Sequence, residues 1–232
     1  MRPEDMTVVH ELPLFADMSD AAFARLMQAS YLQLFPPQVQ LIAEGDPADF
    51  LHVVVEGCVE LFASAGGRET TMALVYPVST FILAAVVRDA DYLMSGRTAE
   101  KSRVLLIPAR DIRTAFAEGG SFARAVVAEL AGSFRTLVKE FKNHKLRTGV
   151  ERLANRLLRL NAEQGATGRL ALPYDKRTLA SLLGMTPENL SRAFGTLKPY
   201  GVEVNGSQIR LTRISDLESL AKPHPLIDDW ER

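Results

Sequence analysis

Three side chains near the C-terminal end have the types and the spacing to read the edges of DNA bases. Glu188, Ser191 and Arg192 fall in the stretch PENLSRAF, where helical spacing puts them on one face, away from Leu190 and Phe194. An arginine can donate two hydrogen bonds to O6 and N7 of guanine, and a glutamate can accept one from N4 of cytosine. The pattern predicts a helix with an exposed polar face whose side chains suit contact with DNA. A solvated helix face with ordinary charges is the alternative.

The preceding residues predict a second helix and a tight turn that would present this reading helix. Residues 177–183 carry leucines at helical spacing, and Gly184 ends that helix because glycine adopts positive φ without strain. Thr186 offers an N-cap oxygen to the next helix, and Pro187 occupies the first helical position. The stretch therefore predicts a helix-turn-helix.

A hairpin is predicted directly after the reading helix. Residues 202–211 alternate apolar and polar side chains about the pair Asn205-Gly206, which is a strong short-range hairpin signal. A hairpin in this position forms the wing of a winged helix-turn-helix.

Positive charge is concentrated in the same part of the chain. Residues 135–213 carry 15 Lys and Arg against 6 Asp and Glu, a net charge of +9, and the other residues carry 12 against 22, a net charge of −10. Such asymmetry is expected where one end of a protein meets phosphates. Besides Glu188, Ser191 and Arg192, the expected DNA contacts are Thr186, Asn189, Lys176 and Arg177. Further candidates for phosphate contacts, each equally well explained as a surface charge, are Arg147, Arg152, Arg156, Lys198 and Arg210.

The first half of the chain predicts a β-rich domain. Residues 19–27 form a capped amphipathic helix, and short β-branched or aromatic runs alternate with turn residues from 39 to about 106. A β-rich half followed by a winged helix-turn-helix resembles the bacterial CRP/FNR transcription regulators, and EGDPADFLHVVVEG at residues 44–57 resembles their cyclic-nucleotide-binding β-roll. The resemblance implies an α+β fold, with a β-roll sensor domain at 1–120, a dimerisation helix at 121–147 and a winged helix-turn-helix domain at 148–232.

The reading helix carries a more specific resemblance. Glu188, Ser191 and Arg192 match the E-x-x-S-R pattern of the FNR-type members of that family. The resemblance implies that these residues recognise a TTGA-like half-site, that double-stranded DNA, a second copy of the chain and RNA polymerase are partners, and that the protein is not an enzyme. The sequence also lacks the motifs of phosphate loops, HExxH zinc sites and nucleophile elbows.

The residues expected around the effector depart from the cyclic-nucleotide pattern. Leu83 and Ala84 stand where that family has a Gly-Glu pair, so no carboxylate is present to accept the ribose hydroxyl. Arg97, followed by Thr98, resembles the family's Arg-Ser/Thr pair but comes several residues too late in the strand. The sequence predicts an apolar effector pocket, with a cyclic-nucleotide-responsive regulator as the alternative. Its expected lining is Phe81, Leu83, Ala84, Tyr92, Met94 and Arg97.

The apolar run at 81–86 and residues 92–95 resemble the nitrogen-oxide-responsive NnrR/DNR branch. This resemblance implies nitric oxide sensing, control of denitrification genes, and haem b as a cofactor. The candidate axial ligands are His10, expected in a flexible N-terminal arm, and His144, near the end of the long helix. His52 is expected to point outward from a strand or to pair locally, and His224 lies in the tail. An ordinary surface or hydrogen-bonded role is the alternative for each.

A long helix is expected from 122 to about 147, capped by Ser121, and it carries an apolar seam with near-heptad spacing. The spacing favours dimerisation, and burial against the chain's own sensor domain is the alternative. The seam residues are Val126, Leu130, Phe134, Leu137 and Phe141.

Cysteine content and hydropathy indicate the compartment. Cys58 is the single cysteine, so the chain has no internal disulfide and cannot alone ligate an iron–sulfur cluster, which fits a reducing cytoplasm. The longest apolar run, 81–87, is too short to span a bilayer, and the first residues lack the apolar segment of a signal peptide. We expect a cytoplasmic protein with no membrane contact. Two other classes stay open: a sensor that acts through protein contacts, and a sensory subunit of a nucleotide-dependent enzyme.

Overall fold

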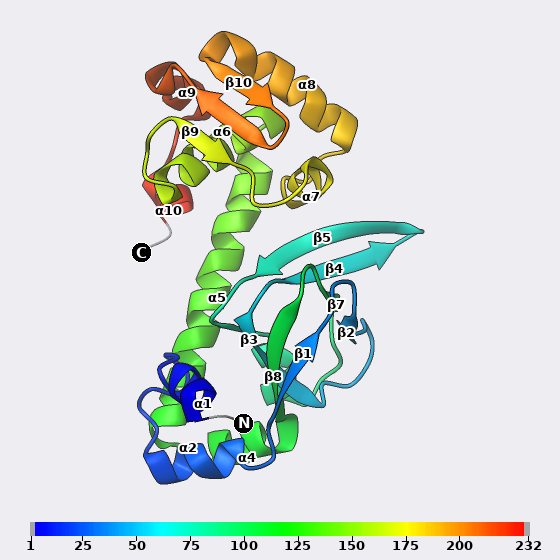
Figure 1. The fold of residues 1–232 in the computed structure, drawn as a ribbon, viewed down its shortest axis with the longest axis vertical. Coiled ribbons are helices and arrows are strands. Elements are labelled where there is room, and N and C mark those ends of the chain that lie inside the picture. The colour runs from blue at the N-terminus through cyan, green and yellow to red at the C-terminus, as the bar shows by residue number, and fades with distance from the viewer. Residues whose placement is uncertain (1–2, 230–232) are drawn as a thin grey trace. The chain divides into compact units, whose positions relative to one another are not determined.

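The computed structural model describes residues 3–229 and divides into two compact units, Met1–Ser133 and Phe134–Arg232. The division falls inside the long helix α5 (Gly120–Leu146), which begins in the first unit and ends in the second (Figure 1). Both units combine helices and strands, so the predicted α+β class is confirmed. Helix α5 begins at Gly120, and Ser121 therefore lies within its first turn, not before it as predicted.

Two four-stranded antiparallel sheets form the centre of the first unit. One has the strand order β1-β8-β3-β6 and the other has the order β2-β7-β4-β5, which gives the predicted β-roll. The strands are β1 (Tyr31–Phe35), β2 (Gln40–Ile42), β3 (Phe50–Glu56), β4 (Val59–Ala65), β5 (Arg68–Val75), β6 (Ser79–Phe81), β7 (Ser95–Thr98) and β8 (Ser102–Pro108).

Helices accompany these sheets. The first unit contains α1 (Pro3–His10), α2 (Asp20–Met27), α3 (Leu83–Arg88) and α4 (Ala109–Ala117). Helix α2 begins as predicted, because the Ser19 hydroxyl accepts a hydrogen bond from the Ala22 N–H at 3.3 Å. Helix α1 was not predicted, and it replaces the flexible arm expected at the N-terminus.

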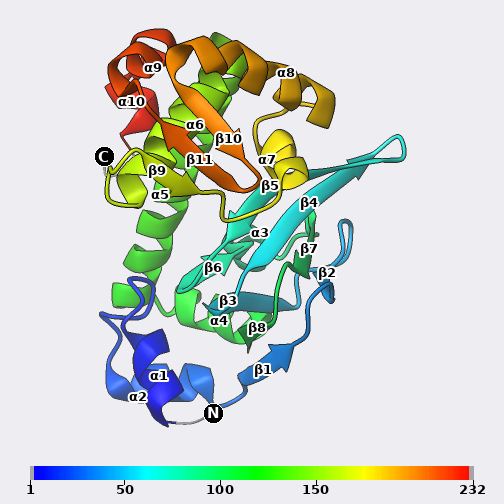
Figure 2. The same ribbon diagram turned by 45° about the horizontal axis from the view of Figure 1, so that its top comes forward.

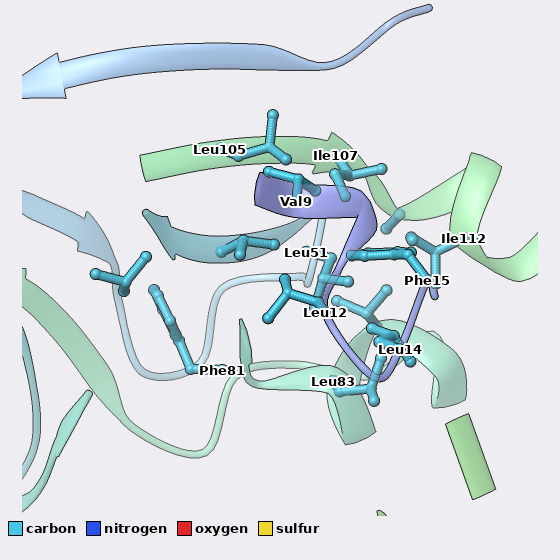
Figure 3. Close-up of a cluster of buried hydrophobic side chains, with 14 of the residues drawn as sticks. Val9, Leu12, Leu14, Phe15, Leu51, Phe81, Leu83, Leu105, Ile107 and Ile112 are labelled. Atoms are coloured by element: carbon cyan, nitrogen blue, oxygen red, sulfur yellow. The ribbon is translucent and has the colours of Figure 1, made fainter. Parts of the chain in front are cut away.

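One apolar core joins the sheets and helices of this unit (Figure 3). The rings of Phe15 and Phe122 lie 6.1 Å apart and bring the loop after α1 against the start of α5. Because side chains alternate along a strand, Val59 and Leu61 of β4 face this core and Glu60 faces away from it. The core members labelled in the figure are Val9, Leu12, Leu14, Phe15, Leu51, Phe81, Leu83, Leu105, Ile107 and Ile112.

The second unit is a winged helix-turn-helix (Figure 2). Its first full helix is fixed by a capping box, in which Thr148 and Glu151 satisfy each other's backbone N–H groups. A three-stranded sheet of order β10-β11-β9 packs beside the helices. The elements are α6 (Gly149–Glu163), β9 (Arg169–Ala171), α7 (Lys176–Leu182), α8 (Pro187–Leu197), the 3-10 turn η1 (Lys198–Tyr200), β10 (Val202–Asn205), β11 (Gln208–Leu211), α9 (Ile214–Ala221) and α10 (Pro225–Asp228).

The wing is present, but its turn lies one residue later than the sequence predicted. Asn205 pairs with Gln208 at the end of the ladder, so the two-residue loop is Gly206-Ser207. Gly206 has φ +62°, and its lack of a side chain allows this conformation without strain.

Candidate nucleic-acid interface and effector region

Helix α8 has one buried face and one exposed polar face. Leu190, Phe194 and Leu197 are buried in the core of the second unit. Glu188 and Arg192 are exposed, as are Ser191 and Asn189. The predicted base-reading side chains therefore share one accessible face of α8. That they contact bases stays a prediction.

The first turn of α8 fixes the charge state of one of these side chains. The Thr186 hydroxyl accepts a hydrogen bond from the Asn189 N–H at 3.2 Å, so Thr186 is the predicted N-cap. The backbone N–H of Glu188, the Thr186 hydroxyl and the nearby charge of Arg192 lower the pKa of the Glu188 carboxyl. Glu188 is therefore an ionised, acceptor-only group at neutral pH, as a partner for the amino group of a base must be.

Helix α7 and the turn hold α8 in place. The Asp175 carboxylate caps α7 by accepting a hydrogen bond from the Thr178 N–H at 2.7 Å. Lys176 and Arg177 are exposed on the first turn of this helix. Gly184 has φ +61°, and a Cβ on it would lie 2.9 Å from Cε1 of His144. The turn needs glycine for its backbone conformation and also for the histidine ring packed against it.

Three of the basic residues that the sequence offered as phosphate contacts form hydrogen bonds within the second unit, and the burial of the Arg147 side chain contradicts its prediction. The Arg147 side chain is 7% exposed and binds Asp228. Arg152 donates from Nε to the Leu183 carbonyl at 2.9 Å and from Nη1 to the Arg147 carbonyl at 2.8 Å. Arg156 donates to the Tyr174 hydroxyl at 2.8 Å. Lys198 and Arg210 remain exposed.

The apolar seam of α5 divides into a buried part and an exposed part. Val126 is fully buried in the core of the first unit, so its predicted role in dimerisation is wrong, and Leu130 packs against the same core. Phe134, Leu137 and Phe141, in the second unit, are 66%, 66% and 60% exposed. Large apolar side chains three and four residues apart on one helix form a continuous stripe, which is typical of an interaction surface.

The residues predicted to line the effector pocket do not form one lining. Phe81 and Leu83 belong to the apolar core, and Met94 packs against it. Tyr92 is also buried, and its hydroxyl donates to the Phe50 carbonyl at 3.2 Å. Ala84 is exposed on α3 and lies outside the apolar core, and its place in a pocket lining stays a prediction.

Arg97 belongs to an ionic network outside the core. It pairs in register with Glu60, so both side chains lie on the face of the sheet opposite the core. Arg97 donates to Glu60 at 2.8 Å and to Glu69 at 2.6 Å, and its guanidinium lies 4.3 Å from the centre of the Phe62 ring. The carboxylates of Glu69 and Glu60 raise the pKa of Arg97. The prediction that Arg97 lines an effector pocket is wrong, because this cation faces away from the core and is already neutralised.

The two histidines of the first unit differ from expectation. His10 ends helix α1, where its ring stacks on Phe23 at 4.1 Å and its Nε2 lies 3.3 Å from the Met18 carbonyl. His52 is buried instead of facing outward, and its ring stacks on Phe81 at 5.1 Å. Burial lowers the pKa of His52 to about 4, so the ring is neutral at pH 7. Among residues 3–229 the structure gives His52 Nδ1 no hydrogen-bond partner.

The histidines of the second unit have structural roles. The His144 ring packs on Gly184, and His224 accepts a hydrogen bond from the Leu226 N–H at 3.2 Å as the N-cap of α10. Within the described part of the chain, no group of three or more His, Cys, Asp or Glu side chains could hold a metal ion. Among residues 3–229, no helix has the length and apolar character needed to cross a membrane.

Sequence reasoning missed the residues that join the C-terminal elements to α6 and to the short segment before it. Asp228 of α10 binds Arg147 across 81 positions of sequence, and Asn155 of α6 donates to the Ala221 carbonyl at 2.7 Å. A carboxylate in a proline-containing tail carries no local periodicity, so the sequence held no signal for this pairing.

Comparisons with known proteins match both units. A cyclic nucleotide-binding domain model matches residues 32–118, and a Crp-like helix-turn-helix domain model matches residues 151–222. A CRP-like cAMP-activated global transcriptional regulator of Mycobacterium tuberculosis is 22% identical over 215 residues, which cover 90% of this chain and 95% of the relative.

Two solved structures share the fold. FixK2 from Bradyrhizobium japonicum has a TM-score of 0.70 and 24% identity, covering 84% of this chain and 99% of that one. DNR from Pseudomonas aeruginosa has a TM-score of 0.52 and 20% identity, covering 95% and 99%. At these identities the likeness shows the fold and does not distinguish the branches of the family.

The two matched domains occur in the order that the resemblance implied, a β-roll before a helix-turn-helix, and the M. tuberculosis relative shares nearly the whole length. The chain therefore contains a region that matches a cyclic nucleotide-binding domain, followed by a region that matches a Crp-like helix-turn-helix domain, and over 90% of its length it is similar to a CRP-like transcriptional regulator.

Proposed function

We propose that the protein binds a TTGA-like palindrome as a homodimer and reads each half-site with Glu188, Ser191 and Arg192. The observation that carries this proposal is the exposed polar face of α8, where an ionised carboxylate and an unburied guanidinium lie one helical turn apart. Arg192 would donate to a guanine, and Glu188 would accept from a cytosine amino group. Lys176 and Arg177, exposed at the start of α7, and Asn189 would contact the DNA alongside them.

Dimerisation through α5 would supply the two-fold axis that a palindrome requires. The exposed stripe of Phe134, Leu137 and Phe141 supports this assignment, because a second copy of the same helix would cover it. Two recognition helices then meet half-sites about 34 Å apart, one turn of DNA. RNA polymerase is the proposed partner at the promoter, and the cytoplasm is the proposed location.

The effector in our proposal is a small uncharged molecule, and a cyclic nucleotide is the alternative. Ala84 is exposed and offers no carboxylate for a ribose, while Arg97 is neutralised by Glu60 and Glu69 and faces away from the core. The M. tuberculosis relative is described as cAMP-activated, which keeps the alternative under test. On our proposal, adding cyclic AMP raises the DNA affinity by less than about tenfold. A rise of about tenfold or more would favour the alternative.

Nitric oxide sensed through haem b, with denitrification genes as targets, is the second form of the proposal. His10 favours it, because its ring lies in a groove of about 600 Å³ together with Met6 and Phe23. His144 does not fit, since its ring is packed on Gly184. Haem added to the purified protein should give a Soret band that shifts with nitric oxide and disappears in His10→Ala but persists in His144→Ala. A band equally strong in both variants, or none in the parent protein, contradicts this form.

Selection of bound duplexes from a random pool tests the proposed DNA recognition without assuming the site. We expect an inverted repeat containing TTGA-like half-sites one helical turn apart. Recovery of unrelated sequences, with retention that falls steeply with salt, would indicate phosphate binding alone. If Arg192→Ala leaves regulation in cells unchanged, the protein acts through protein contacts or as an enzyme's sensory subunit and not through DNA.

A further inference from the structure

The residues after α9 fold back onto the junction between α5 and α6. This tail, residues 222–229, begins at the last residue matched by the helix-turn-helix model and contains α10. Ile227 of the tail is 5% exposed, so the segment is packed against the second unit. All of the contacts described below lie within that unit.

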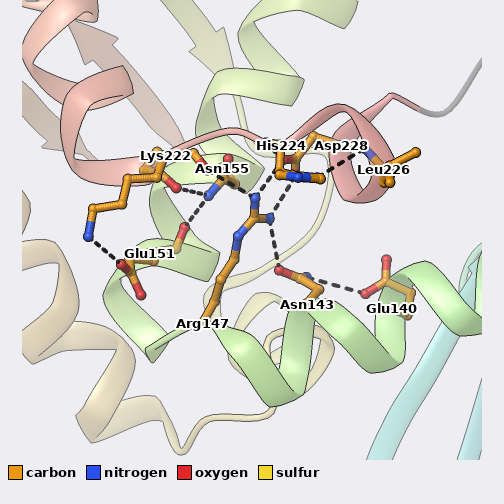
Figure 4. A network of polar contacts seen from close by, with 10 residues as sticks. Glu140, Asn143, Arg147, Glu151, Asn155, Lys222, His224, Leu226 and Asp228 are labelled. Carbon is orange, nitrogen blue, oxygen red and sulfur yellow. Dashed lines mark hydrogen bonds and ion pairs between the residues drawn. The ribbon is translucent and has the colours of Figure 1, made fainter.

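Arg147, between α5 and α6, is the centre of these contacts (Figure 4). Its two terminal nitrogens donate to the two carboxylate oxygens of Asp228 at 2.7 and 2.5 Å. The same guanidinium donates to the Asn143 side chain of α5 at 3.2 Å and to the Lys222 carbonyl at 3.4 Å. A two-bonded arginine–carboxylate pair fixes direction as well as distance, so Arg147 holds the tail in one orientation on α5.

Further contacts tie the same tail to both helices. Lys139 of α5 is buried and donates to the Asp229 carbonyl. Lys222 lies 3.5 Å from Glu151, the capping residue of α6. Burial alone would raise the pKa of the Asp228 carboxyl, but Arg147 and the backbone N–H of His224 hold it below its usual value. Asp228 therefore stays charged and paired at neutral pH.

On the other side, the junction contacts the helix-turn-helix. Arg152 of α6 donates to the Arg147 carbonyl and to the Leu183 carbonyl, which ends α7 directly before the turn into α8. His144 packs on Gly184 in that turn. A continuous chain of contacts thus runs from Asp228 through Arg147 and Arg152 to the residues that aim α8.

We propose that the C-terminal tail is a latch: the Asp228–Arg147 pair fixes the junction between α5 and α6, and through Arg152 it fixes the turn that precedes the recognition helix. With the latch closed, the two helices and the turn move as one body. With it open, the junction becomes a hinge. Such a device allows an effector to change the direction of α8 without unfolding the domain.

Hydrogen exchange of the full-length protein tests the latch. In Asp228→Asn the side chain keeps its size but loses the charged two-oxygen acceptor, so amides of residues 146–152 and 183–186 should exchange about tenfold faster or more. Amides of α8 at 190–197 should keep their protection, because the core beneath them is unchanged. Arg147→Lys keeps the positive charge but cannot donate two parallel hydrogen bonds to Asp228, so it should give the same pattern of exchange.

Glu163→Gln is the matched control, because it removes an exposed ion pair with Arg159 on the same helix α6. This variant should exchange like the parent protein. The latch is wrong if Asp228→Asn and Arg147→Lys exchange like the parent at the junction, or if protection falls equally at 190–197, which would mean general destabilisation. The readout uses no DNA, so a negative result here leaves the DNA proposal standing, and loss of DNA recognition leaves the latch standing.

Discussion

Truncating one residue of the exposed stripe on α5 should weaken the dimer by an amount that the structure bounds. Leu137 is 66% exposed, and full burial of a leucine side chain contributes about 1.5–3 kcal/mol. Covering the exposed two-thirds would contribute about 1–2 kcal/mol per copy, hence about 2–4 kcal/mol per dimer across a two-fold axis. Leu137→Ala should therefore raise the dimer dissociation constant about 30- to 1,000-fold.

Sedimentation equilibrium measures this constant directly. The neighbouring Thr136 is also exposed on α5 but lies off the stripe, so Thr136→Ala is the matched control and should dimerise like the parent protein. Thermal unfolding of the monomeric variant should show an intact fold, because Leu137 is not part of either buried core. An unchanged dissociation constant for Leu137→Ala, or an equal loss for both variants, would refute dimerisation through this stripe.

Three further predictions concern stability. The pKa of His52 is about 4 in the folded protein, compared with an ordinary value of 6.5. Between these two pH values the unfolded chain binds a proton that the folded protein does not. The free energy of unfolding therefore falls as pH drops through that window. Denaturant titrations should lose about 2 kcal/mol between pH 7.5 and pH 5, and His52→Leu should remove that part of the pH dependence; the same loss in both proteins would contradict this cause. Gly184 and Gly206 both have positive φ, so replacing either with alanine should lower the unfolding free energy, by about 1–2 kcal/mol for Gly206→Ala. Gly184→Ala should lower it further, because only Gly184 faces a histidine ring. Equal denaturation midpoints for the two variants would disprove that packing. Arg97→Met should lower the unfolding free energy by about 3 kcal/mol by leaving Glu60 buried without its cation, and a neutral result would show that Glu60 is solvated instead.

The helix-turn-helix was predictable because its signals are local. Thr186, Pro187 and Gly184 act on the backbone within a few residues of themselves, and the spacing of Leu190 and Phe194 reports burial directly. The wing was predictable for the same reason. Its turn was displaced because Asn205 stays in the ladder and the positive φ is taken by Gly206, a choice that the strand pairing makes.

The features that were missed depend on contacts between distant segments. Strand β1 lies before two prolines and becomes a strand only because β8 pairs with it. His52 was expected to point outward from its strand or to pair locally. It is buried instead, and its ring stacks on Phe81 of β6, which pairs with the same strand. Sequence gives the alternation of a strand but not which of its faces a second sheet covers.

The seam of α5 shows the same limit. Spacing alone placed Val126 and Phe141 on one apolar line, but it could not tell that the first is covered by the chain's own core and the second is left exposed. Arg97 likewise resembled a phosphate ligand in sequence, and only the register with Glu60 revealed that it faces away from the core. In both cases the residue type was informative, and the partner was set by tertiary structure.

The most direct test of the central claim compares two duplexes and two proteins. The affinity of the parent protein and of Arg192→Ala should be measured at fixed salt for a TTGA-type palindrome and for the same duplex with the half-site guanines replaced. We predict that the parent prefers the intact palindrome and that Arg192→Ala loses about tenfold or more per half-site on that duplex only, so that both duplexes are bound alike. An equal loss on both duplexes, or none on either, would contradict base reading by α8.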